Sequence, residues 1–370
     1  MSPRARGAWK ALKGIRGMIE EAPPLRGLVV GVGSLGRVML ERLADRSGFQ
    51  CVGIVDVTET GREQGRVMTG LAETALFDNL DRALAAVRPD VVLINTPSEL
   101  HHDQARICID AGCHLLVAKP ITNDFADAVD LVKRAEERGV TLCVGQQIRY
   151  MRHFTALAEY VASGALGSAE AAWFMNSKPR PEVRNLGKML QPSLYENTCH
   201  HFDAFLSVFQ EQDPLWICCD GFVPSWSKYA GPCMVNAMMR FDGGLHLSYH
   251  GGFSSQAPMM EFRIEGSQGA LRCRGLHMSN ETIAYESAPA LGDFSPCQID
   301  GHVPPRNPWG PLLDAWIAYI RGGPEPPFSG RRNLKVFAML SAAIASVETG
   351  NPVAIAENPK YSAAFSGDGS

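Results

Sequence analysis

The sequence predicts an α/β domain with a doubly wound parallel sheet, followed by an α+β domain with a large, mostly antiparallel, open-faced sheet. From residue 27 to about residue 145, short apolar runs alternate with helix-like segments, and a glycine-rich turn follows the first apolar run. Strands that are buried on both faces of a parallel sheet have this continuous apolar character. The second half instead contains strand-like runs separated by short turns with Gly or Pro, which is typical of antiparallel sheets.

The glycine-rich turn is the most informative motif in the first half. The segment Gly31-Val32-Gly33-Ser34-Leu35-Gly36 follows the apolar run Leu28–Val30 and precedes the helix-like run Arg37–Leu43. A second apolar run, Cys51–Val55, ends at Asp56, which lies twenty residues beyond Gly36. A strand, a glycine turn, a helix, a second strand and an acid at this spacing predict a dinucleotide-binding unit.

Each position of this turn has a physical role. Gly31 allows the tight turn, Gly33 lets a pyrophosphate approach the backbone, and Gly36 lets the helix pack close to the strand. Ser34 and Leu35 begin the helix, where free N–H groups and the helix dipole favour phosphate.

The remaining elements are expected in alternation along the chain. The stretch after Asp56, which contains Thr, Glu, Gly and Arg, is expected to be exposed. Pro289–Pro311 is expected to be a long loop that forms a lid or an interface arm. In the first half the expected elements are a helix Asp81–Val87, strand Val91–Ile94, helix His102–Ala111, strand His114–Val117, helix Asp124–Arg138 and strand Thr141–Val144. In the second half they are strands Ala169–Asn176, Leu215–Phe222, Val235–Phe241, Leu245–His250, Met260–Glu265 and Gly269–Cys273, with helices Glu196–Val208, Leu312–Ile320 and Leu334–Thr349.

Composition limits the class of function. The 370 residues allow two domains, here expected at 27–148 and 149–370, after a basic arm over 1–26 that is either flexible or docks on a neighbouring subunit. A net charge of −4 argues against a nucleic-acid binder, and no apolar stretch is long enough to span a membrane. The ten cysteines form no C-x-x-C pair, which predicts a cytoplasmic protein without a metal site.

Polar residues at the ends of the predicted strands are candidates for ligand binding, because ligands bind beyond the carboxyl ends of parallel strands. Besides the glycine turn and Asp56, these are Asn95-Thr96-Pro97, Lys119-Pro120 and Gln146-Gln147. Lys119 ends a strand and precedes a proline, so we expect its ammonium to point into the crevice. The alternative is an ordinary surface lysine.

A second candidate group lies in the predicted helix Glu196–Val208. Glu196, His200 and Asp203 would share one face of an α-helix, because residues at i, i+4 and i+7 lie above one another. A carboxylate beside an imidazole suits a general base for a substrate hydroxyl. Two structural alternatives remain open: Glu196 caps the first turn, or His200 is a core histidine.

Several of these segments together resemble the Gfo/Idh/MocA oxidoreductase family, over residues 27 to 355. The resemblance covers Val91–His101, Ala111–Pro120 with the family's AGxH…EKP pattern, Val144–Tyr150 with VGfNxRF, Leu194–Asp203 with D-x-G-x-H-x-x-D, and Ser346–Val353 with SaxxGxxV. It implies a Rossmann domain, an NAD cofactor and a homodimer or homotetramer. It further implies a dehydrogenase or reductase acting on a secondary alcohol or ketone of a sugar or cyclitol.

The resemblance also implies roles for individual residues. Lys119 and His200 would be the catalytic pair, with His200 taking the hydroxyl proton, and Glu196 would support His200. Asp56 would bind the adenosine ribose and favour NAD, although Arg62 leaves NADP open. The remaining expected cofactor contacts are Gly31, Gly33, Ser34, Leu35, Gly36, Thr96, Pro97, His101, Lys119 and Gln147; the expected substrate contacts are Lys119, Arg149, Tyr150, Lys178, Arg180 and His200.

Two departures from the family pattern leave other functions open. Ala118 stands where the family has glutamate before Lys-Pro, and Glu196 stands where it has aspartate. Losing one cofactor contact at Ala118 would cost about 0.5–1.5 kcal/mol. The basic residues around Lys178 and Arg180 suggest an anionic substrate group or a solvated loop. An NAD-dependent redox-assisted glycosidase and a non-catalytic NAD-sensing regulator remain alternatives. His246, Ser248 and His250 share one strand face, which lines either the substrate pocket or a subunit interface; we favour the interface.

Overall fold

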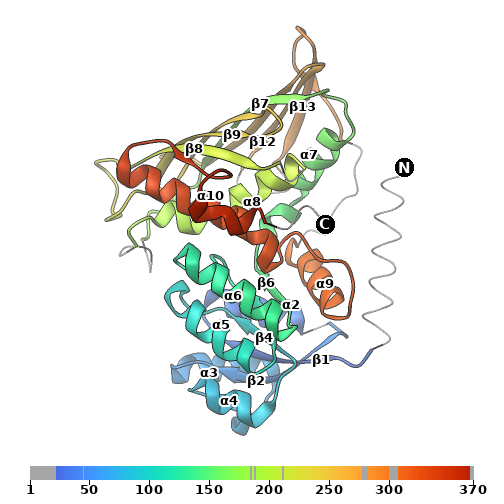
Figure 1. Ribbon diagram of the computed structural model, residues 1–370, viewed down its shortest axis with the longest axis vertical. Coiled ribbons are helices and arrows are strands. Elements are labelled where there is room, and N and C mark those ends of the chain that lie inside the picture. Colours follow the sequence, from blue (N-terminus) through green and yellow to red (C-terminus); the bar gives the residue numbers. More distant parts are fainter. Residues whose placement is uncertain are drawn as a thin grey trace. The chain divides into compact units, whose positions relative to one another are not determined.

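The computed structural model describes residues 22–44, 46–183, 186, 189–210, 212–276, 282–299 and 307–366, which form two compact units (Figure 1). The first unit extends to Gln146 and includes Trp309–Leu334; the second contains Gln147–Pro308 and the chain from Lys335 onward. Trp309–Leu334 was expected in the second domain and belongs to the first unit, so this part of the expected boundary is wrong. Most of the predicted basic arm lies outside the described residues, and its last two residues are in the first strand.

The first unit contains the predicted parallel sheet, with six strands. The strand order β3-β2-β1-β4-β5-β6 reverses direction at β1, as in a doubly wound sheet, and every pairing is parallel. The strands are β1 (Leu25–Val30), β2 (Phe49–Val55), β3 (Leu76–Phe77), β4 (Val91–Ile94), β5 (His114–Val117) and β6 (Leu142–Val144).

Helices cover both faces of this sheet. Right-handed crossovers place α2 (Ser34–Leu43) and α3 (Glu59–Thr69) on one face, because the chain moves outward from β1 to β3. They place α4 (Leu80–Val87), α5 (His101–Asp110) and α6 (Phe125–Arg138) on the other face (Figure 1). No helix among the described residues is long and apolar enough to span a bilayer.

Helix α3 occupies the stretch after Asp56, for which exposure was expected but no helix was predicted. Thr58 caps it by accepting a hydrogen bond from the Gly61 N–H at 3.0 Å. Its buried residues are Gly61 and Gly65, and a Cβ at Gly65 would lie 2.5 Å from the Ile54 side chain. The helix therefore packs on β2 through glycine, and it has no apolar periodicity for a sequence pattern to detect.

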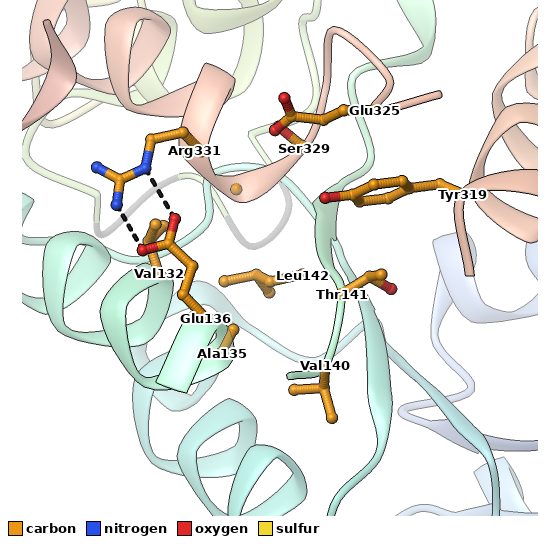
Figure 2. A pocket seen from close by; sticks show the side chains of 11 residues that line it. Val132, Ala135, Glu136, Val140, Thr141, Leu142, Tyr319, Glu325, Ser329 and Arg331 are labelled. Carbon is orange, nitrogen blue, oxygen red and sulfur yellow. Dashed lines mark hydrogen bonds and ion pairs between the residues drawn. The ribbon is translucent and has the colours of Figure 1, made fainter. Parts of the chain in front are cut away.

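The segment that returns to the first unit borders β6. The Val144 N–H donates to the Phe328 carbonyl at 2.9 Å, and Arg331 pairs with Glu136 of α6 through contacts of 2.9 and 2.6 Å. Figure 2 shows this ion pair beside a small pocket lined by residues of α6, β6 and the returning segment. The pocket lies at the amino end of β6, whereas ligands bind at the carboxyl ends of such strands.

The second unit contains a nine-stranded sheet in the order β14-β13-β12-β11-β7-β10-β9-β8-β15. It is mixed, because β7 and β10 pair in parallel while the remaining pairs are antiparallel. A two-residue strand, β14, also lies within the predicted loop Pro289–Pro311. The strands are β7 (Ala169–Ser177), β8 (Pro214–Phe222), β9 (Met234–Phe241), β10 (His246–Gly252), β11 (Met259–Gly266), β12 (Gly269–Gly275), β13 (Ala284–Pro289), β14 (Ser295–Pro296) and β15 (Val353–Ala354).

The two faces of this sheet have different surroundings. On one face, Phe174 of β7 and Phe205 of the helix α8 (Cys199–Val208) lie 5.2 Å apart between ring centroids, in a core shared with α7 (Arg152–Ala162) and α10 (Gly330–Thr349) (Figure 1). On the other face, Trp173 is 43% exposed and Met238 is 56% exposed. The sheet is therefore open on this face, as predicted.

The buried His153 predicts acid-sensitive stability. Burial lowers its pKa to about 4, whereas an unfolded chain has an ordinary imidazole pKa of about 6.5. As the pH falls between these values, the unfolded state takes up a proton that the folded state does not. We therefore expect the free energy of unfolding to fall by about 1.4 kcal/mol per pH unit from this residue alone.

Urea unfolding at pH 4.5 to 7 of the wild type and His153→Met tests this expectation. In His153→Met the free energy of unfolding should change with pH less steeply than in the wild type, by about the contribution of one proton. His246→Gln, on the open face, should keep the wild-type dependence on pH. An equal slope in wild type and His153→Met would show that His153 is not the source.

Candidate active site

The glycine turn allows three backbone segments to approach closely at the carboxyl edge of the parallel sheet. Gly31 has φ +83°, and a Cβ there would lie 3.0 Å from the backbone at Asn95 and Thr96, just beyond β4. A Cβ at Gly36 would lie 2.0 Å from the Gly31 carbonyl oxygen. Any side chain at Gly36 would push α2 away from the turn, so both glycines are required by contact distance.

The turn leaves open the space that a pyrophosphate needs. A Cβ at Gly33 would meet no atom within 4 Å, and α2 begins there with no side-chain cap and no acidic residue in its first turn. The first N–H groups of α2, at Ser34 and Leu35, therefore suit a bound phosphate. The Asn95 side-chain amide N is buried without a hydrogen-bond partner among the described residues, so it too suits a ligand acceptor. These features fit a dinucleotide such as NAD.

Asp56 joins the glycine turn to helix α3. One carboxylate oxygen accepts from the Val32 N–H at 2.8 Å, and the other accepts from the Thr58 N–H and hydroxyl at 2.9 and 2.7 Å. The predicted ribose-binding acid thus also fixes the turn that would hold the phosphates. Spacing in the sequence predicted where Asp56 lies, but not that its carboxylate fixes the glycine turn.

The charge of Asp56 is stabilised by these contacts. Burial alone would raise its pKa, but the hydrogen bonds from Thr58 and Val32 and the positive charge of Arg62 outweigh burial and lower it. Arg62 donates to the Asp56 carbonyl at 2.8 Å. A cation therefore lies beside the predicted ribose site, in keeping with the NADP alternative.

The loops after β4 and β5 carry the other residues predicted at this edge. The Thr96 hydroxyl donates to the Gln104 side chain at 2.6 Å, Pro97 is exposed, and Lys119 is half-buried. His101 differs from expectation: it is 1% exposed, and its ring nitrogens face the carbonyls of Thr96 and Pro120. This geometry contradicts a direct cofactor contact for His101.

In the second unit, Glu196 lies in a π-helical turn and not in an α-helix. The turn spans Leu194–Thr198 and closes with a bond from the Cys199 N–H to the Leu194 carbonyl, after which α8 begins. The predicted continuous helix Glu196–Val208 is therefore wrong in its first turn, because the π turn contains one extra residue. Glu196 is half-buried and His200 is 6% exposed. Such turns are common at functional sites.

A buried polar network holds this π turn on the sheet. The Asn176 amide donates to His201 Nε2 at 2.7 Å, so Nδ1 carries the proton and donates to the Tyr249 oxygen at 3.0 Å. The Tyr249 and Thr198 hydroxyls share a further hydrogen bond at 3.0 Å. Burial, with the Lys178 charge adding to it, holds the pKa of His201 well below its ordinary value. His201 is therefore neutral and structural, although it adjoins the predicted base His200.

Arg149 forms a buried ion pair with Asp203 of α8. Arg149 Nε lies 3.3 Å from Asp203 Oδ2, and both side chains are at most 2% exposed. This contact fixes the short 3₁₀ helix Gln147–Tyr150 against α8. It favours a structural role for Arg149 over the expected substrate contact. Gln147 has a buried side-chain oxygen with no partner among the described residues, and Tyr150 is half-buried.

Arg180 is held in place by aromatic packing. Its guanidinium lies 4.6 Å from the centre of the Phe253 ring, and Tyr229 stacks on the other residues of this group at 5.8 Å from Phe253. Within the described part of the chain, no carboxylate pairs with this guanidinium. Lys178, two residues earlier, is half-buried. Sequence reasoning missed Tyr229 and Phe253, which are far from Arg180 along the chain.

Comparison with known sequences identifies the family. Residues 25–146 match an oxidoreductase family described as an NAD-binding Rossmann fold, and residues 184–355 match its C-terminal α/β domain. The chain belongs to the Gfo/Idh/MocA family of oxidoreductases. The protein is therefore an NAD(P)-dependent oxidoreductase, and the resemblance in its sequence motifs is confirmed.

Several relatives of this chain are named for activities on sugars or inositols. The chain is 24% identical over 314 residues to 1,5-anhydro-D-fructose reductase from Ensifer adhaerens, covering 82% of this chain and 91% of that protein. It is 33% identical over 143 residues to an inositol 2-dehydrogenase from Mycolicibacterium vanbaalenii, covering 38% of this chain and 41% of that protein. The structure of aldose-aldose oxidoreductase from Caulobacter crescentus is similar in fold, with TM-score 0.78, 20% identity and coverage of 90% and 99% of the two chains.

The network at Tyr249 predicts a measurable loss of stability on losing one hydroxyl. Tyr249→Phe would leave the His201 N–H and the Thr198 hydroxyl without this partner, at a cost of about 1–3 kcal/mol. Tyr285→Phe is the matched control, because the Tyr285 hydroxyl is buried without a partner in the described chain. Urea unfolding should show Tyr249→Phe destabilised and Tyr285→Phe unchanged or more stable. Equal costs would contradict the network.

Proposed function

We propose that this oxidoreductase interconverts a secondary alcohol and a ketone on a sugar, a cyclitol or a derivative of one. The open cradle at Gly33, together with the ionised Asp56 beside it, carries the cofactor half of this proposal. The activities of the relatives support the substrate class. NAD, when bound, supplies the hydride acceptor for alcohol oxidation.

The chain's own residues manage the proton and the charge on oxygen. Oxidation removes a hydride from carbon and a proton from the hydroxyl, so a base and a hydrogen-bond donor are needed at the oxygen. We assign the base to His200 and the donor to Lys119. Glu196, one turn before His200, supports the proton-accepting form of its imidazole.

Arg180 favours a substrate with an anionic group, such as a uronate or a sugar phosphate. Stacking on Phe253 orders the guanidinium before any ligand binds, which reduces the entropy lost on binding. Its planar set of N–H donors matches a carboxylate or phosphate. We also place the protein in a reducing compartment such as the cytoplasm, because its cysteines are scattered along the chain and form no C-x-x-C pair.

We also propose that the open face of the nine-stranded sheet joins two copies of the chain, in a homodimer or homotetramer. Trp173, Met175 and Met238 are each more than 40% exposed there. Ser248 lies in register with Met238 and Trp173 across its two neighbouring strands, and His246, two residues earlier on the same strand, shares that face. Clustered exposed apolar side chains of this kind are typical of interfaces.

Formation of NADH tests the catalytic assignment. Wild-type protein with NAD should produce absorbance at 340 nm with at least one member of a panel of sugars, uronates and inositols. Lys119→Ala should lower kcat by about 100-fold or more, because it removes the donor to the developing oxyanion. Its cofactor affinity should change only a few-fold. Lys133→Ala, on the exposed side of α6, is the matched control and should behave as wild type.

Three other outcomes would contradict parts of the proposal. Full activity in Lys119→Ala would remove Lys119 from the mechanism. Cofactor binding without turnover across the panel would favour a regulatory NAD sensor. Release of a glycone without net NADH would favour the redox-assisted glycosidase.

A further inference from the structure

His101 bridges the two loops that extend the sheet at its carboxyl edge. The residue begins α5, and only 1% of its surface is exposed. Nδ1 lies 2.8 Å from the carbonyl oxygen of Pro120, and Nε2 lies 2.9 Å from the carbonyl oxygen of Thr96. The ring therefore spans the loop after β4 and the loop after β5.

The chemistry of both contacts requires donation from the ring. Carbonyl oxygens only accept hydrogen bonds, so a ring with protons on both nitrogens donates to both, and a neutral ring donates to one. Burial lowers the pKa of His101, and the carbonyls of Pro120 and Thr96 oppose this shift. A side chain without an N–H could not donate to either carbonyl, and the bridge between the two loops would be lost.

The bridged loops carry residues with predicted roles in the reaction. The backbone hydrogen bonds between β4 and β5 continue one residue beyond β5, where the Ala118 N–H donates to the Ile94 carbonyl at 2.8 Å. Lys119 follows immediately, and Pro120 contributes the carbonyl that faces His101. The position of the Lys119 backbone therefore depends on the β-sheet bond of Ala118 on one side and on the His101 ring on the other.

We propose that His101 is a positioning residue that fixes the Lys119 loop relative to the Thr96 loop. The role assigned to Lys119 rests on the proposed function; the bridge between the loops does not. A displacement of about 1 Å in a catalytic group can cost about 100-fold in rate. The His101 ring would control the reaction without touching substrate or cofactor.

Two amide variants separate the two contacts. In His101→Asn the amide nitrogen lies near the place of Nδ1 and can still donate to Pro120. In His101→Gln it reaches the place of Nε2 and can still donate to Thr96. His114→Gln is the matched control, because His114 accepts from the Thr141 N–H at 2.9 Å at the opposite, amino edge of the same strands.

Amide hydrogen exchange followed by mass spectrometry reports on each loop without any need for turnover. In His101→Asn, peptides over 95–100 should exchange about tenfold faster than in wild type, and peptides over 117–122 should not change. His101→Gln should show the reverse, and His114→Gln should change neither loop. Unchanged exchange in both loops of a folded His101 variant would overturn the proposal. If one variant does not fold, the other decides alone.

Kinetics of the same variants connect the bridge to Lys119. With a turned-over substrate, His101→Gln should lower kcat about tenfold, and His101→Asn should lower it less than threefold, because only His101→Asn keeps the Pro120 contact. Cofactor affinity should remain within a few-fold in both. Equal kcat in the two variants would overturn the link to Lys119. If the variants show the predicted exchange pattern but even the wild type shows no turnover, the proposed function is contradicted and the bridge between the loops stands.

Discussion

Close backbone packing between the glycine turn, helix α2 and the segment after β4 is the constraint on which the cofactor half of this protein depends. No Cβ fits at Gly36, which would lie 2.0 Å from the Gly31 oxygen, or at Gly31, which faces the backbone of Asn95. Asp56 then joins this turn to α3 through its carboxylate. The open space at Gly33 and the uncapped start of α2 are consequences of this packing.

Much of the fold was predictable because its signals are local. The four-residue strands β4 and β5 have the predicted bounds, since an apolar run buried on both faces is distinctive. Helix α3 was missed because Gly61 and Gly65 form its buried side. The parallel pairing of β7 with β10 joins segments that are distant in sequence, and strand patterns do not encode the direction of a partner. The return of Trp309–Leu334 to the first unit is non-local for the same reason.

Which residues form the candidate site was easier to predict from the sequence than what each residue does there. Spacing identified the glycine turn and Asp56, and the family resemblance identified Lys119 and His200. Spacing did not reveal that His101 and Arg149 are buried, because their partners are backbone carbonyls and a distant aspartate. The prediction at Glu196 also relied on α-helical spacing. The structure instead has a π turn there, together with a buried contact of Thr198. Side chains in such contacts are chosen by tertiary structure, which no local pattern reports.

Cofactor titration of Gly33→Ala tests the central claim most directly. Gly33 has φ −67°, which alanine adopts, and its Cβ would meet no atom of the protein within 4 Å. We therefore expect unchanged stability towards urea and an affinity for NAD that falls by at least about tenfold, or 1.4 kcal/mol. Wild-type affinity in a stably folded Gly33→Ala would contradict a pyrophosphate site at this turn.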